Sequence, residues 1–247
     1  VLHGDDVRPI ADWCNMIRID MKPGTYDFRT CEPFGMQYLK IACVSGKVDV
    51  FDVNLVAIVC PEKITASYTG SDLAPAKIFE AAKQSFMQNS VDIFMDCPTR
   101  ERAGWLCDSF FTARSERFFT GKNDIEHNFL ENFLLAEHYP NVPDGMLPMC
   151  YPSDHYDGNY IPNWAMWFVL ELEDRQKRTG DKAFAAAYKE KVYRLLDFFK
   201  KYENQDGLLE KLEAWVFLEW SKANELTQDI NFPSNMLYAK TLLAAAH

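Results

Sequence analysis

The feature that most constrains the fold is a change in the spacing of apolar residues near residue 70. Before this point apolar and polar residues alternate, as in residues 47–50 (KVDV), and a period of two is typical of a β-strand. After it, apolar residues recur three and four positions apart, as in Trp164, Trp167 and Phe168. This longer period is typical of a helix with one face on a core. We therefore expect a β part followed by an α part.

Residues 1–69 are expected to form the C-terminal part of a β-sandwich-like domain. Candidate strands cover residues 36–44 and 47–60. The apolar parity reverses after Val50, as it does at a β-bulge or where a strand crosses between sheets. Because a complete sandwich needs about 100 residues, this segment is interpreted as the tail of a larger domain.

Residues 70–247 are expected to be helical. Asp72 can cap a helix that runs to about Asn89, and Asp181 can cap another that follows a helix ending at Thr179-Gly180. Further helices are predicted over 108–119, 124–138 and from about 233, and the helix capped by Asp181 is expected to continue through Val192, Leu195, Leu196 and Phe199. The short Pro, Gly and Asp-rich connections predict stacked antiparallel hairpins. The first residue is not Met and the last predicted helix has no stop signal, so we expect a part of a longer protein.

Charge and composition argue against several classes of protein. The 26 Lys and Arg residues against 36 Asp and Glu give a net charge of −10, which argues against nucleic-acid binding. No apolar run approaches about 18 residues, so no membrane span is predicted. Seven scattered cysteines without a C-x-x-C pair argue against a zinc ribbon or a disulfide scaffold and are expected to be free thiols.

No cofactor or metal is predicted. The sequence has no P-loop, no dinucleotide fingerprint and no Gly-x-Ser-x-Gly elbow. Asp154, His155 and Asp157 could be read as metal ligands, but one histidine in a tyrosine-rich turn is more typical of a hydrogen-bonded loop.

Residues 96–108 (DCPTRERAGWLCD) carry the densest chemical signal, with three carboxylates, two guanidiniums and a tryptophan. Pro98 and Gly104 predict a loop, and Asp108 is expected to cap the following helix. A group that protonates a glycosidic oxygen needs a raised pKa, which neighbouring carboxylates and an apolar wall such as Trp105 supply. The alternative to a catalytic loop is a purely structural one, in which an Asp caps the helix, an Arg and a Glu pair on the surface, and Trp105 packs in the core.

This stretch resembles the signature of the inverting α-L-rhamnosidases of glycoside hydrolase family seventy-eight, whose common form is Asp-Cys-Pro-x-Arg-Asp-Glu-Arg-x-Gly-Trp-x-Gly-Asp. The resemblance implies that Glu101 is the general acid. It also implies substrate contacts from four further residues of the stretch, namely Asp96, Arg100, Trp105 and Asp108.

Two departures from that signature concern the fit of the sugar. One acidic residue between Arg100 and Glu101 is missing, and Cys107 stands where the family has glycine. Neither removes a carboxylate, and both leave the exact substrate open.

The resemblance extends more loosely over residues 30–247. It implies the C-terminal part of a β-sandwich-like domain (1–69) followed by the first half of an (α/α)6 six-hairpin barrel (70–247), truncated at its C-terminus. Residues 154–164, 219–220 and 231–235 resemble barrel loops and the helices after them. Trp164 and Trp220 are therefore predicted to stack on sugar, with core packing as the alternative.

The implied function is hydrolysis of terminal α-L-rhamnosyl linkages, with inversion, in a rhamnose-containing oligosaccharide or glycoside. The family's general base lies far later in the barrel, so this fragment is expected to lack it, and Glu213 and Glu219 have no motif to support them as bases. Two alternatives stay open, another (α/α)6 glycosidase and a catalytically inactive sugar-binding relative. The bacterial compartment, periplasm or cytoplasm, and the oligomeric state also stay open.

Overall fold

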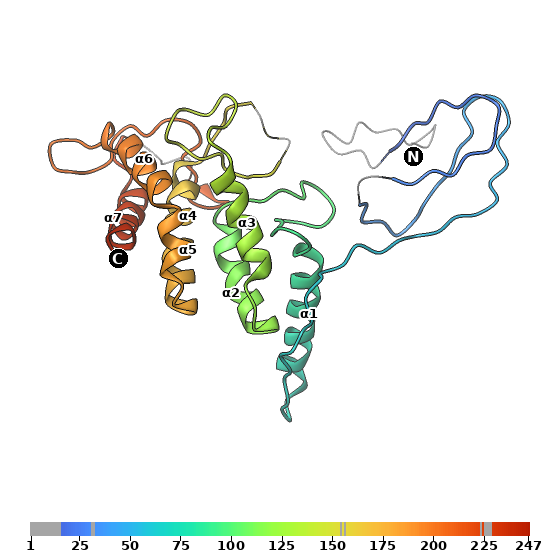
Figure 1. Ribbon diagram of the computed structural model, residues 1–247, viewed down its shortest axis with the longest axis horizontal. Helices are drawn as coiled ribbons and strands as arrows, with labels where there is room; N and C mark the ends of the chain where they lie inside the picture. The colour runs from blue at the N-terminus through green and yellow to red at the C-terminus, as the bar shows by residue number, and fades with distance from the viewer. Residues whose placement is uncertain (1–15, 31–32, 154, 156, 223, 225–228) are drawn as a thin grey trace.

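The computed structural model describes residues 16–30, 33–153, 155, 157–222, 224 and 229–247. These residues form seven α-helices that lie side by side (Figure 1). The helices are α1 (Leu73–Asn89), α2 (Asp108–Thr120), α3 (Asp124–Leu135), α4 (Pro162–Thr179), α5 (Lys182–Ala187), α6 (Lys189–Lys200) and α7 (Phe232–Ala246).

The predicted helix signals are confirmed where they are local. The carboxylate of Asp72 accepts a hydrogen bond from the Ala74 N–H at 2.9 Å and starts α1. Asp181 does the same for α5 through the Phe184 N–H at 3.0 Å. Two predictions are wrong. Helix α3 ends at Leu135 and not near residue 138, and the single helix expected after Asp181 is divided at Tyr188 into α5 and α6. These caps fill backbone donors that a helix leaves unpaired at its start.

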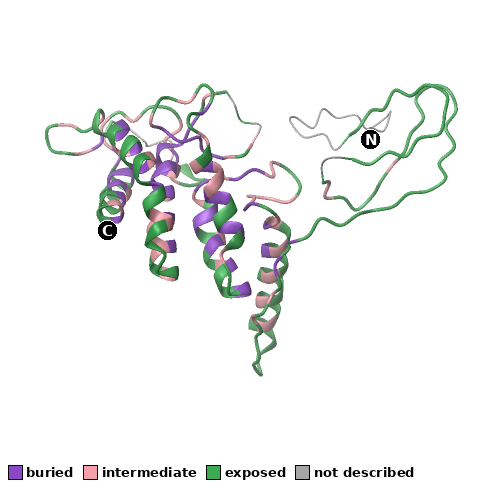
Figure 2. Ribbon diagram, in the orientation of Figure 1, coloured by how far each residue is buried: buried purple, intermediate pink, exposed green. Residues whose placement is uncertain are grey.

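Helix α4 is the centre of the packing. It packs against α2, α5 and α7, while α1 and α3 pack on α2. Buried residues occur all round α4, whereas those of α3, α6 and α7 lie on one side of each helix (Figure 2). Phe129, Phe133 and Phe168 have no exposed surface, and their rings form a continuous stack between α3 and α4. An all-round buried helix is expected only inside a layered helical domain.

The long connections gather at one end of the helices (Figure 1). At the opposite end, residues 121–123 join α2 to α3 and residues 180–181 join α4 to α5. The long connections are residues 90–107, 136–161 and 201–231, which lead into α2, α4 and α7. Loops on a rigid helical frame are where functional groups concentrate, and residues 96–107 belong to the first of these three, directly before Asp108 at the start of α2.

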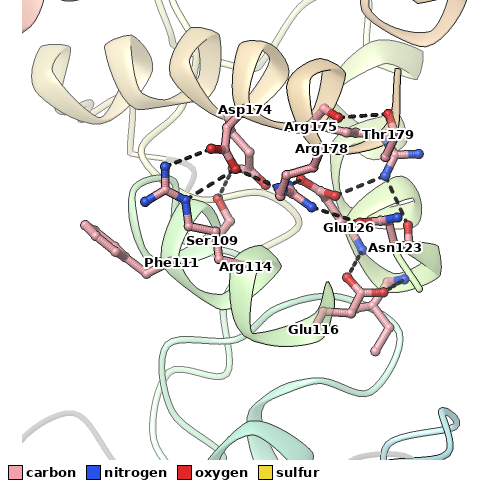
Figure 3. A network of polar contacts seen from close by, with 12 residues as sticks. Ser109, Phe111, Arg114, Glu116, Asn123, Glu126, Asp174, Arg175, Arg178 and Thr179 are labelled. Atoms are coloured by element: carbon pink, nitrogen blue, oxygen red, sulfur yellow. Dashed lines mark hydrogen bonds and ion pairs between the residues drawn. The ribbon is translucent and has the colours of Figure 1, made fainter. Parts of the chain in front are cut away.

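A buried ionic network fixes α2, α3 and α4 to one another (Figure 3). Glu126 of α3 accepts hydrogen bonds from Arg175 at 3.0 Å and Arg178 at 2.6 Å, both on α4. Asp174 of α4 pairs with Arg178 at 2.7 Å and with Arg114 of α2 at 2.8 Å. The Glu126 side chain has no exposed surface. Charges buried this deeply need good partners, so the network ties the three helices in one arrangement.

The β part of the predicted fold is not confirmed. Between residue 16 and α1 the described residues are extended and contain no strand. Tyr38, Val44 and Phe51 are 89%, 96% and 87% exposed. A strand exists only through ladder hydrogen bonds to a neighbour, and the described residues of this segment supply none. Residues 1–15 lie outside the described part.

The helices were also compared with what a lipid bilayer requires. None of those in the described part of the chain combines the length and the apolar character needed to cross a membrane.

Candidate active site

The loop over residues 96–107 is closed on itself by three hydrogen bonds. The Asp96 N–H donates to the Ala103 carbonyl at 3.2 Å, and the Ala103 N–H donates to Asp96 Oδ1 at 3.1 Å. The Glu101 N–H points to the Cys97 sulfur at 3.2 Å. The side chain of Asp96 is thus partly used to shape the loop that carries Glu101.

The next residues pair with the segment before α4. Tyr151 N–H donates to the Gly104 carbonyl at 2.9 Å, and Leu106 N–H donates to the Met149 carbonyl at 3.0 Å. A Cβ atom at Gly104 would lie 2.5 Å from the Tyr151 carbonyl oxygen, a distance that no side chain tolerates. Glycine is therefore required here, because two backbones approach closely.

Glu101 is held from two sides. The indole N–H of Trp105 donates to its Oε2 at 3.1 Å, and Arg100 forms an ion pair with its Oε1 at 2.8 Å. Partial burial raises the pKa of Glu101, and the neighbouring carboxylate of Asp96 raises it further, while Arg100 and Trp105 oppose both effects. A carboxyl group with a raised pKa in hydrogen-bonded surroundings can act as a proton donor.

Asp108 completes a group of three carboxyls. Asp108 is an exposed residue, but partial desolvation of its carboxyl raises its pKa to about 6, and the charges of Asp96 and Glu101 contribute to the rise. The three side chains therefore influence one another electrostatically, as predicted from their spacing. At neutral pH this end of the molecule concentrates negative charge, which favours a cationic transition state.

The prediction that Asp108 caps α2 is wrong. Cys107 occupies the cap position with φ +74° and ψ −55°, and Asp108 is the first residue of the helix. A positive φ is unfavourable for any residue with a Cβ, which explains a glycine at this position in the resembling signature. Burial raises the pKa of the Cys107 thiol to about 12, and the carboxyls of Asp108 and Glu171 add to this. The thiol is therefore not a nucleophile at neutral pH.

Helix α2 is anchored directly behind Asp108. The Ser109 hydroxyl donates to Glu171 Oε2 of α4 at 2.5 Å, and both residues are buried. Complete burial raises the pKa of Glu171 well above its ordinary value. This contact sets the position of the first turn of α2, and with it the carboxyl of Asp108, against the central helix.

The two other predicted tryptophans belong to one aromatic group, and Trp164 of this group packs in the same small cluster as Ala103 of the loop. Phe217 contacts both of them, with ring centroids 5.0 Å from Trp164 and 5.0 Å from Trp220. Trp164 is partly buried and packs with Ala103 in a small cluster that Trp105 also joins. Trp220 is 82% exposed. Trp164 is therefore partly a core residue, whereas Trp220 is not.

Sequence reasoning missed three residues of this neighbourhood. Trp215 lies 5.9 Å from Trp220 between ring centroids, and Phe217 joins the group as described. The sequence could have indicated them, because Trp215 and Phe217 stand two positions apart in residues 211–222 and their side chains can therefore lie on the same side of the chain. His155, considered only as a metal ligand, has its ring 5.6 Å from that of Trp105. In the part of the chain that the structure describes, no cluster of His, Cys, Asp or Glu suits a metal ion, and Asp154 lies outside that part.

The chain is thus a domain of helical hairpins that carries a carboxyl-rich loop and a group of tryptophans. The family model described as bacterial alpha-L-rhamnosidase six-hairpin glycosidase domain matches residues 63–246. The chain therefore belongs to this family, and the resemblance noted in the sequence is confirmed.

Individual relatives agree with this assignment. An alpha-L-rhamnosidase of Formosa agariphila is 21% identical over 195 residues, which are 76% of this chain and 20% of that protein. A family GH78 rhamnosidase of Bacillus sp. GL1 has a TM-score of 0.66 at 24% identity, over 75% of this chain and 19% of that one. A Klebsiella oxytoca rhamnosidase, solved with rhamnose bound, has a TM-score of 0.59 at 20% identity, over 76% and 35%.

These comparisons show two things, the fold of the helical part and the share of a full-length relative that this chain spans. The structural matches confirm the helical part of the predicted fold. The chain spans about a fifth of the curated relative that it matches.

Proposed function

We propose that the protein to which this chain belongs hydrolyses terminal α-L-rhamnosyl linkages with inversion, in rhamnose-containing oligosaccharides or glycosides, and that Glu101 is its general acid. One observation carries the proposal. The Glu101 carboxyl is held by Trp105 and Arg100 beside Asp96, and its pKa is raised. The family to which the chain belongs supports the same reaction.

In the proposed step, protonated Glu101 donates its proton to the glycosidic oxygen as the bond from that oxygen to the anomeric carbon breaks. The leaving group departs as a neutral alcohol, and positive charge develops on the sugar ring. A water molecule attacks the opposite face and gives its proton to a second carboxylate, about 6.5–9.5 Å from the first in inverting enzymes. We do not assign that base to Glu213 or Glu219, because neither has support beyond its charge.

We assign substrate contacts to the residues around the acid. Asp96 and Asp108 would accept hydrogen bonds from sugar hydroxyls, and Arg100 would donate them. Tryptophan faces suit the C–H side of a pyranose ring. Trp105 is supported as such a face by its place in the loop, and Trp220 by its exposure and by its contact with the Trp215 and Phe217 rings, which belong to the same cluster as Trp105.

The finer domain description is part of the same proposal. We assign residues 1–69 to the tail of a β domain and residues 70–247 to the first half of an (α/α)6 barrel. Support comes from the alternating pattern before residue 60 and from the family match, which begins at residue 63.

A panel of 4-nitrophenyl glycosides tests the substrate class. The full protein is expected to hydrolyse the α-L-rhamnoside much faster than the corresponding β-D-glucoside or α-L-arabinoside. Proton NMR during the reaction should show β-rhamnose before the anomers equilibrate. Preference for another sugar would favour a different glycosidase, and saccharide binding by calorimetry without turnover would favour an inactive sugar-binding relative.

A further inference from the structure

A cavity lies between the segment that follows α3 and the first turns of α6. Its volume is about 320 Å³, at the lower end of the range for small-molecule sites. Its floor includes buried side chains, among them Tyr139, Met146 and Leu147. None of the residues of the candidate active site lines it.

One wall of the cavity forms where the backbone at Gly145 approaches the backbone of α6 closely. Gly145 has φ +85°, and a Cβ atom there would lie 2.6 Å from the carbonyl oxygen of Arg194. Only glycine allows the turn to lie directly on α6. The wall is therefore set by the backbone and not by flexible side chains.

Lys191 places an ammonium group in this cavity without a counter-ion. Its Nζ donates to the Ala136 carbonyl at 2.7 Å and lies 3.5 Å from the Tyr139 hydroxyl. Both partners are neutral, and among the described residues no carboxylate pairs with it. Burial lowers the pKa of Lys191 to about 8, and the charge of Arg194 contributes. A half-buried cation with neutral partners gains free energy from an added anion.

The other charged groups of the cavity lie at its rim. Arg194 is paired with Asp144, so these two charges compensate each other. Glu137 and Glu190 are exposed, and His138 is beside Glu137. Carboxylates at a rim accept hydrogen bonds from hydroxyl groups, although they repel a ligand that carries several negative charges.

We propose that this cavity binds a small hydroxycarboxylate, with the ligand carboxylate on the Lys191 ammonium and its hydroxyl groups on the rim carboxylates. The single interior cation and the acceptors around it select a ligand with one negative charge and several hydroxyls. The site uses no residue of the proposed catalytic group, so it stands or falls independently of the rhamnosidase proposal.

The test is an NMR titration of the full protein with glucuronate, and with glucose as the uncharged sugar of the same ring size. Glucuronate is expected to bind with a millimolar Kd and to shift the amide signals of residues 136–147 and 187–194, whereas glucose does not. Lys191→Gln should weaken glucuronate at least tenfold. Lys189→Gln, at the first residue of the same helix, should leave the affinity unchanged.

A pH series on the unsubstituted protein gives a readout that does not depend on a variant folding. Since binding needs the ammonium form, affinity should fall as pH rises through about 8, where an ordinary lysine with a pKa of about 10.4 is still charged. Equal shifts with glucose, no glucuronate shifts in this region, full affinity in Lys191→Gln, or affinity unchanged to about pH 9 would each overturn the proposal.

Discussion

The indole nitrogen of Trp105 lies 3.1 Å from Oε2 of Glu101 and donates a hydrogen bond to it. Because this bond favours the ionised carboxylate, it lowers the pKa that burial and Asp96 raise. One tryptophan thus combines two properties, a flat apolar face and control over the proton of the candidate acid.

Removal of the indole N–H should raise the pKa of Glu101. In Trp105→Phe the aromatic ring stays and the hydrogen bond is lost, so the neutral carboxyl is favoured. The measurement is an NMR titration of the Glu101 side-chain carboxyl carbon in both proteins. An unchanged or lower pKa in the variant would contradict the role given to this bond.

Replacement of Asp96 should change the pKa of Glu101 in the opposite direction. Asp96→Asn removes the negative charge that raises the pKa of Glu101, while its amide oxygen can still accept from the Ala103 N–H. The same titration is expected to give a lower pKa for Glu101. Asp92→Asn, an exposed position nearby, is the matched control and should leave the value unchanged. A rise in Asp96→Asn would show that the two carboxyls do not repel each other.

The ionic network of Figure 3 should carry a large share of the stability. Glu126→Ala leaves Arg175 buried without its carboxylate partner, and loss of one member of a buried pair costs about 3–5 kcal/mol. Urea unfolding measures the loss. Lys200→Ala, which breaks an exposed pair with Asp197, is the control and should have no measurable effect. Equal stability of the two variants would mean that the network is not tightly coupled to folding.

Glu116 should make stability depend on pH. This buried carboxyl accepts the N–H groups of Ile125 and Glu126 at 2.9 and 3.0 Å, and burial together with Glu62 raises its pKa from 4.5 to about 8. The folded state therefore holds a proton that the unfolded state has lost. Its stabilising contribution is complete below about pH 4.5 and declines as pH rises to about 8, by at most about 1.4 kcal/mol per pH unit.

Glu116→Gln removes this titration. The free energy of unfolding of the variant, measured in urea between pH 5 and 8, should fall less steeply with pH than that of the unsubstituted protein. Parallel pH profiles would contradict the raised pKa. The slopes are compared because carboxyls that do not interact with Glu116 titrate equally in both proteins.

The helices were predictable because their signals are local. Asp72, Asp181 and the residues that repeat every three or four positions determine where helices begin and which side is buried. The chemistry of residues 96–108 was predictable for the same reason, since Glu101 contacts residues within five positions of it in the chain.

Contacts between distant segments were not predictable from one sequence. Ser109 meets Glu171, and Trp164 meets Phe217, only because α2, α4 and the loop before α7 come together in space. The alternating pattern over residues 47–60 has the opposite problem. It marks a capacity to form strands, which is realised only where a neighbouring strand supplies ladder hydrogen bonds.

The most direct test of the central claim compares Glu101→Gln with the unsubstituted full protein on two rhamnosides. A general acid matters most when the leaving group is a poor one. The account predicts that kcat/KM falls by roughly 10²–10⁴-fold for methyl α-L-rhamnoside and much less for 4-nitrophenyl α-L-rhamnoside, whose leaving group needs little protonation, with an unchanged fold. An equal loss on both substrates, or activity like that of the unsubstituted protein, would contradict the assignment of Glu101 as the acid.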